Sequence, residues 1–197
     1  MSEMYSLIVA GSGEAASHLP SLFEAKVRST VRYADPAAWI TANAVTRAVA
    51  GAESLLAEWR HEIGIVAIGD QGPGKSMADV QAAAVTGFSS PLHYAASSPG
   101  TLAGVSCIAF GLRGPTMNLT MPPQDGIPVA MMLCAGWLAR GAARFMIVAT
   151  CHTGSSGTTV SRAMLLAPPG FSGAGTPLAE SVVTWLAAVD AADGANA

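Results

Sequence analysis

Charged side chains are scarce in this sequence: only 12% of its 197 residues are Asp, Glu, Lys or Arg, and the formal net charge is −3. The isoelectric point is near 5.7 and no basic residues cluster, so the chain lacks the positive surface that nucleic acids and anionic membranes require. Both classes of partner are therefore excluded. Apolar residues make up 51% of the chain and the mean hydropathy is +0.41, a composition that predicts a large face covered by protein.

Cysteine and long hydrophobic runs are also scarce. Cys107, Cys134 and Cys151 are odd in number and lack the spacing of metal ligands, so we expect no metal site and interpret them as buried free thiols in a reducing cytoplasm. The uncharged run from Val80 to Leu112 is interrupted by prolines and serines, so no membrane helix is expected. No cationic region precedes the first short apolar run, so we expect no secretory signal and a cytoplasmic location.

The order of apolar segments predicts one α/β domain over residues 1–167. Residues 168–197 are interpreted as a linker, an amphipathic helix over Leu178–Val189 that starts at Pro177, and a tail. The pattern over residues 36–60 predicts helix, with Asp35 and Pro36 as its start signal. Strands are predicted at 5–10, 63–69, 116–121, 145–149 and 159–166.

The stretch from Gly111 to Thr153 has the order strand, sharp turn, helix, loop and strand, which is half of a βαβ unit. Pro122 and Pro123 disfavour helix at the turn, and Asp125 is a suitable N-cap for a helix that begins near Gly126. Enzymes place nucleophiles at such elbows, because the helix N-terminus lowers the pKa of a thiol and backbone N–H groups bind an oxyanion.

Several pieces of sequence carry a resemblance to a known family. Gly111-Leu112 and Gly114-Pro115 precede the elbow, and Arg140-Gly141-Ala142 follows its helix. Ser97–Gly104 and Ile63–Gly69 lie upstream in the matching order. Over residues 60–153 the chain resembles β-ketoacyl synthases of the thiolase superfamily. The resemblance implies an α/β, thiolase-like half-fold, with a mixed, mostly parallel sheet flanked by helices.

The resemblance places the family's nucleophilic cysteine at Pro123, counted from Pro115, with Gln124 next to it. Proline supplies neither a thiol nor a backbone N–H. The family's histidines come from a C-terminal half that 197 residues do not provide. The chain therefore most resembles chain-length-factor-like, short ketosynthase N-terminal-like subunits, which are inactive by themselves. Chain-length factors usually carry glutamine at the cysteine position, one place before Gln124.

The same resemblance implies partners and contact residues. The partners would be an active ketosynthase subunit and an acyl carrier protein of type II fatty acid or polyketide biosynthesis, in a heterodimer or a homodimer and without a cofactor. The strand before the elbow would pair across the interface, and the chain would shape the acyl tunnel. The shared strand would contain Met117, Asn118, Leu119 and Thr120. The subunit contact and tunnel wall would include Pro123, Gln124, Met131, Met132, Phe88 and Tyr94.

Two phosphate-binding patterns compete with this interpretation. The segment Gly69–Ser76 matches G-x-x-x-x-G-K-[ST] between an apolar strand and a helix-like run. Pro73 would remove an N–H from that loop, and no Mg²⁺-binding Asp follows the later strand. Gly11–Ala16 matches G-x-G-x-x-A, although Asp35 lies in a turn-like segment rather than at a strand end. The residues that would bind a nucleotide in the first pattern are Gly69, Gly74, Lys75 and Ser76.

A self-associating scaffold, homodimeric through the elbow strand, is the remaining alternative.

Cys151 and His152 are adjacent, but neighbours on a strand point to opposite faces, so they are not expected to form a thiol–imidazole pair.

Overall fold

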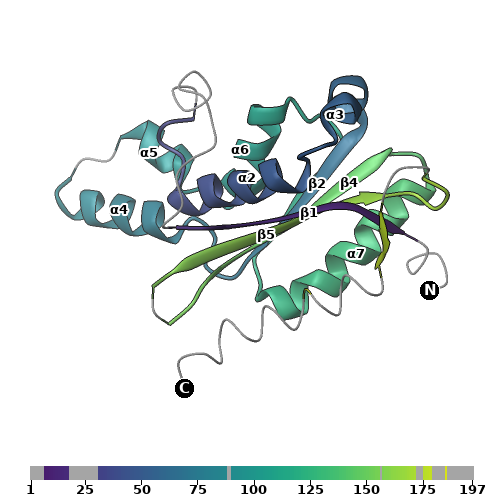
Figure 1. Cartoon of the computed structure of the whole chain (residues 1–197). Helices are drawn as coiled ribbons and strands as arrows, with labels where there is room; N and C mark the ends of the chain where they lie inside the picture. Colours follow the sequence, from purple (N-terminus) through teal and green to yellow (C-terminus); the bar gives the residue numbers. More distant parts are fainter. Residues whose placement is uncertain are drawn as a thin grey trace.

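The computed structural model describes residues 7–17, 31–87, 90–155, 157–171, 175–178 and 185. These residues form a six-stranded sheet in the order β3-β2-β4-β5-β1-β6, with helices on both faces (Figure 1). The strands are β1 (Ile8–Ala16), β2 (Ile63–Gly69), β3 (Thr116–Leu119), β4 (Phe145–Thr153), β5 (Thr159–Ala167) and β6 (Thr176–Pro177). The helices are α2 (Pro36–Ala48), α3 (Glu53–Trp59), α4 (Gly74–Val85), α5 (Pro91–Ala96), α6 (Thr101–Phe110) and α7 (Pro123–Ala139), with the short 3-10 helix η2 (Arg60–Glu62).

The sheet is mixed, as predicted. β2 pairs in parallel with β3 and β4, whereas β5 pairs antiparallel with both β4 and β1, and β6 pairs antiparallel with β1. Strands β1 to β4 therefore share one direction, but the parallel pairings are confined to β2. β5 runs the other way because the link from Thr153 at the end of β4 to Thr159 at the start of β5 is short, and so short a link permits only antiparallel pairing.

The core has two parts, one on each face of the sheet. Side chains of β2 are buried along its whole length because the strand is central and covered on both faces. In β4, Phe145 and Ile147 face the cluster under α2 and α6, while Met146 and Val148 face the cluster under α7. The strands that the sequence predicted at 63–69 and 145–149 are confirmed.

The dinucleotide-binding interpretation of Gly11–Ala16 is wrong. These residues continue β1 and form no turn into a helix. The absence of a side chain at Gly13 instead lets α2 pack directly on the strand, since a Cβ there would lie 2.5 Å from the Ala44 carbonyl oxygen. Asp35 does not end a strand: it caps α2, and its Oδ1 accepts a 2.8 Å hydrogen bond from the Ala37 N–H.

Several predicted boundaries change. The single helix expected over 36–60 is divided into α2 and α3 by a turn in which Gly51 has φ +86°, a conformation that favours glycine. The predicted helix Leu178–Val189 lies outside the described residues except for Leu178 and Trp185, which pack into the α7 cluster. Among the helices that the structure describes, none is both long and apolar enough to cross a bilayer.

Candidate functional site

The elbow joins the edge strand β3 to the long helix α7. Pro122 is the N-cap with extended backbone (φ −55°, ψ 142°), and Pro123 is the first helical residue. The predicted start near Gly126 with Asp125 as N-cap is wrong, because proline is well tolerated at the first helical position. Gly126 packs against the side chain of Ile68, so the first turn of α7 lies over the carboxyl end of β2.

The elbow has the shape of a nucleophile site but lacks its chemical groups. Pro123 is buried and has neither a thiol nor an N–H. The N–H groups of Asp125 and Gly126 both bond to the Pro122 carbonyl oxygen, at 3.1 and 3.0 Å. In the first turn of α7 this leaves the N–H of Gln124, whose side chain is exposed. The turn cannot supply the paired N–H donors that stabilise an oxyanion.

The cysteines do not replace the missing thiol. Cys134 lies on α7 eleven positions after Pro123, which corresponds to about 16 Å along the helix. Burial raises the pKa of the Cys134 thiol and raises that of Cys151 to about 12. Burial also raises the pKa of Cys107, which lies 3.7 Å from the Thr116 hydroxyl. All three are free thiols that stay protonated at neutral pH.

We therefore expect iodoacetamide at pH 7.5 to alkylate the folded protein much more slowly than free cysteine, with Cys107 the first to react. The raised pKa values keep the thiolate fraction small, and Cys134 and Cys151 are also shielded. Mass spectrometry after timed labelling measures this, and the same reaction in urea should modify all three. Rapid labelling of one cysteine in the folded protein would reveal an activated thiol.

An imidazole–carboxylate pair lies at the carboxyl edge of the sheet. Asp70 directly follows β2, and its Oδ2 is 3.3 Å from Nδ1 of His152 on the neighbouring strand β4. The Cys151 sulfur instead lies 3.8 Å from the Ala37 carbonyl oxygen of α2, which confirms that it does not pair with His152. The sequence analysis did not predict the Asp70–His152 contact. The signal was present, because both residues lie at the carboxyl ends of predicted strands that pair side by side in parallel.

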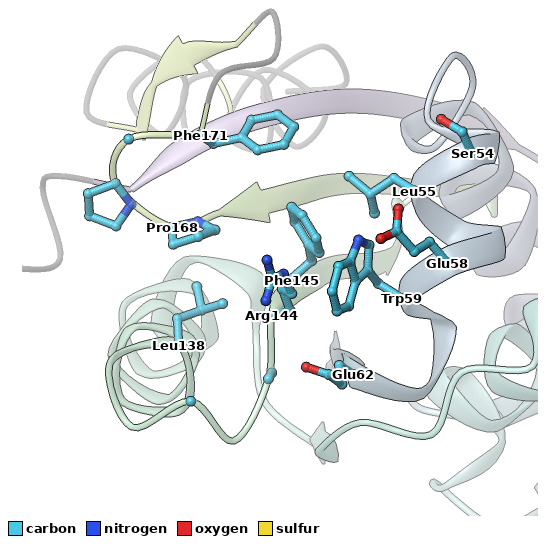
Figure 2. A pocket seen from close by; sticks show the side chains of 14 residues that line it. Ser54, Leu55, Glu58, Trp59, Glu62, Leu138, Arg144, Phe145, Pro168 and Phe171 are labelled. Atoms are coloured by element: carbon cyan, nitrogen blue, oxygen red, sulfur yellow. The ribbon is translucent and has the colours of Figure 1, made fainter.

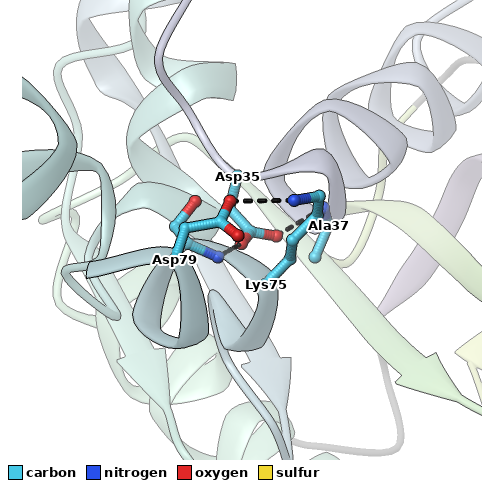
Figure 3. Close-up of polar contacts among 5 residues, drawn as sticks. Asp35, Ala37, Lys75 and Asp79 are labelled. Carbon is cyan, nitrogen blue, oxygen red and sulfur yellow. Dashed lines mark hydrogen bonds and ion pairs between the residues drawn. The ribbon is translucent and has the colours of Figure 1, made fainter. Parts of the chain in front are cut away.

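Two carboxylates of the protein itself, those of Asp35 and Asp79, bind groups of the Gly69–Ser76 segment (Figure 3). Gly69 ends β2 and Gly74 begins α4. The Ser76 N–H donates a 2.7 Å hydrogen bond to Oδ2 of Asp35, and Lys75 forms a 2.8 Å ion pair with Asp79 that raises the Lys75 pKa. The groups that would bind phosphate therefore have internal partners. Nucleotide binding stays an untested prediction that this geometry does not favour.

The predicted shared strand, β3, is the end strand of the sheet, so one of its edges carries no partner strand among the described residues. Met117 is 36% exposed there, and Thr120 is exposed just after the strand. Asn118 serves the fold, since its Oδ1 accepts a 3.1 Å hydrogen bond from the Ala103 N–H of α6. Leu119 packs against the α7 cluster.

The other predicted contact residues are divided between core and surface. Met131 is buried in the α7 cluster, whereas Met132 is 63% exposed on the same helix. Tyr94 is 71% exposed on α5. Phe88 lies outside the described residues.

Exposed large apolar side chains recur on four consecutive elements that end at β3. α4 has no buried residue at all. These side chains are Met77 and Val85 of α4, Leu92 and Tyr94 of α5, Ile108 of α6, and Met117 of β3. An exposed apolar side chain on an end strand, such as Met117, is typical of a surface that another protein covers.

Comparisons with known proteins agree with this architecture. No protein-family model matches the chain. No curated protein sequence matches it either. Solved structures do match: the ishigamide ketosynthase/chain length factor has a TM-score of 0.65 and 13% sequence identity, over 88% of this chain and 64% of that one.

Two further structures show the same likeness. A type II polyketide synthase acyl-carrier protein in complex with its ketosynthase bound to the hexaketide (AntDE:AntF) gives a TM-score of 0.62 at 12% identity, over 82% of this chain and 62% of that one. The ketosynthase ApeO in complex with its chain length factor ApeC, from Xenorhabdus doucetiae, gives 0.56 at 13% identity, over 83% and 79%. The chain therefore has the thiolase-like ketosynthase fold, and it spans less than two thirds of the length of the first two matched chains.

Proposed function

We propose that this chain is a non-catalytic, chain-length-factor-like subunit that pairs with an active ketosynthase in type II fatty acid or polyketide biosynthesis. The observation that carries the proposal is the combination, within one β3–α7 unit, of a strand edge that no other described strand pairs with and an elbow with Pro123 at the position of the nucleophile. In this proposal the strand, elbow and helix serve to bind the partner subunit, and the partner subunit catalyses the condensation.

The surface chemistry supports pairing through β3. A free edge beside apolar side chains can add a strand from a second chain, which gains main-chain hydrogen bonds and buries the apolar groups together. Met117 is the large apolar side chain that is exposed on β3 itself. The partner's strand would lie along Thr116–Leu119, and Ile108 of α6 would lie next to it at the contact.

The elbow would then form part of the wall of the acyl tunnel. Gln124 is exposed at the start of α7, and its amide can bond to an acyl carbonyl without attacking it. Met132 offers a flexible apolar side chain on the same helix. In this proposal the acyl carrier protein delivers its chain to the partner ketosynthase, and both proteins work in the reducing cytoplasm.

Co-expression tests the proposal. A tagged ketosynthase encoded beside this gene should capture this chain on an affinity column, and the two proteins should then elute together in size exclusion. Light scattering of that peak should give the mass of a heterodimer. Condensation of acyl groups from the acyl carrier protein should require both subunits. A monodisperse monomer that captures neither protein would contradict the proposal.

Self-association is the second candidate, because the same free edge of β3 can pair with a second copy of the chain. A stable homodimer that excludes the ketosynthase and binds no acyl carrier protein would favour a scaffold over an accessory subunit.

A further inference from the structure

A cavity formed by described residues lies at the end of the sheet opposite the elbow. It has a volume of about 740 Å³ and opens between α3, the C-terminal end of α7 and the segment after β5 (Figure 2). Glu62 and Arg144 immediately precede β2 and β4, so the cavity lies at the amino ends of these strands. It is therefore separate from the candidate site, and its volume falls in the range of small-molecule pockets.

Aromatic and aliphatic side chains form its walls. Phe145 is 4% exposed and meets Phe171 edge to face, with ring centroids 5.6 Å apart and planes at 84°. Trp59 and Leu55 of α3 form one wall, and Leu138 of α7 lies across the cavity from them (Figure 2). Such walls can bury the apolar body of a ligand.

The charges around the cavity favour a cation. The carboxylates of Glu58 and Glu62 line it, and neither has a hydrogen bond or ion pair within the described parts of the chain. The single cationic side chain of the lining, Arg144, places its guanidinium 3.8 Å from the centroid of the Trp59 ring. This contact shows that the wall already accommodates one positive charge. Two carboxylates against one guanidinium leave the lining with an excess of negative charge.

We propose that this cavity binds a small organic cation with an apolar, ring-sized body. The body packs between Leu138, Phe171 and the Arg144–Trp59 pair, and the ammonium or guanidinium group reaches the carboxylates of Glu58 and Glu62. Recognition combines aromatic contact with charge, so a neutral molecule of the same shape binds more weakly and an anion is rejected by the carboxylates. The proposal does not depend on pairing with a ketosynthase.

Calorimetric titration of the full chain with 2-phenylethylammonium, 2-phenylethanol and 3-phenylpropionate tests this. We expect the ammonium to bind most tightly and its affinity to fall as salt is added. Replacing both carboxylates (Glu58→Gln with Glu62→Gln) should weaken ammonium binding by about tenfold and leave the alcohol unaffected. Both positions are exposed, so these isosteric changes should preserve the fold, which thermal unfolding checks.

Glu53→Gln is the matched control, because Glu53 lies on the same helix outside the cavity and glutamine can still accept the Gly51 N–H. It should change ammonium affinity by less than about twofold. Equal binding of ammonium and alcohol, tighter binding of the carboxylate, or no binding of any probe at millimolar concentration would each overturn the proposal. So would equal losses in the control and the double variant.

Discussion

Met117→Asp is expected to abolish co-purification of this chain with the proposed ketosynthase partner while leaving the fold intact. Met117 is 36% exposed on the end strand of the sheet, so a carboxylate there is hydrated in the free subunit. In the paired state the same carboxylate would be buried beside a partner strand without a counter-ion. Charges on strand edges block edge-to-edge pairing for this reason. We expect a loss of about 3 kcal/mol, or about a hundredfold in the dissociation constant.

Ser12→Asp controls for the added charge. Ser12 is exposed on β1, which β2, β4 and β5 separate from β3. This variant should pair like the parent chain, and circular dichroism should show that both variants are folded. Undiminished pairing of the Met117→Asp variant would place the interface elsewhere.

Gly13→Ala is expected to destabilise the fold strongly. The added methyl group would lie 2.5 Å from the Ala44 carbonyl oxygen and the Ala48 nitrogen, which are backbone atoms of α2. A side chain could rotate away, but here the helix itself must move from the sheet. Because α2 covers one half of the core, the free energy of unfolding should fall by about 3 kcal/mol. Urea unfolding followed by circular dichroism measures the change.

Gly104→Ala is the matched control. Gly104 lies within α6, and a Cβ there would meet no other atom within 4 Å. Alanine should therefore stabilise the helix by about 0.5 to 1 kcal/mol. Equal effects of the two substitutions would show that α2 does not pack on β1 as closely as described.

The sequence was informative where local pattern and tertiary environment agree. β2 and β4 are buried on both faces, so their uninterrupted apolar runs identify them directly. The order of strand, elbow and helix around Pro123 could likewise be predicted, because Pro122 and Pro123 separate two unlike periodicities.

Prediction failed where a distant segment decides the local structure. Gly11 and Gly13 match a phosphate-binding fingerprint, yet they serve the close approach of α2, which no local pattern reveals. Asp35 accepts a hydrogen bond from the N–H of Ser76, which lies 41 residues later in the chain, so the contact could not be predicted from local sequence. The cavity beside Trp59 combines α3, α7 and the end of β5, so its lining could not be assembled from the sequence alone.

Intact-mass spectrometry of the co-purified pair after incubation with an acyl thioester tests the central claim most directly. The account predicts an acyl adduct on the ketosynthase and an unchanged mass for this chain, because its elbow carries Pro123 and its thiols are protonated and largely buried. An acyl adduct on this chain that hydroxylamine removes under native conditions would contradict the account, because it would show that the chain carries a nucleophile of its own.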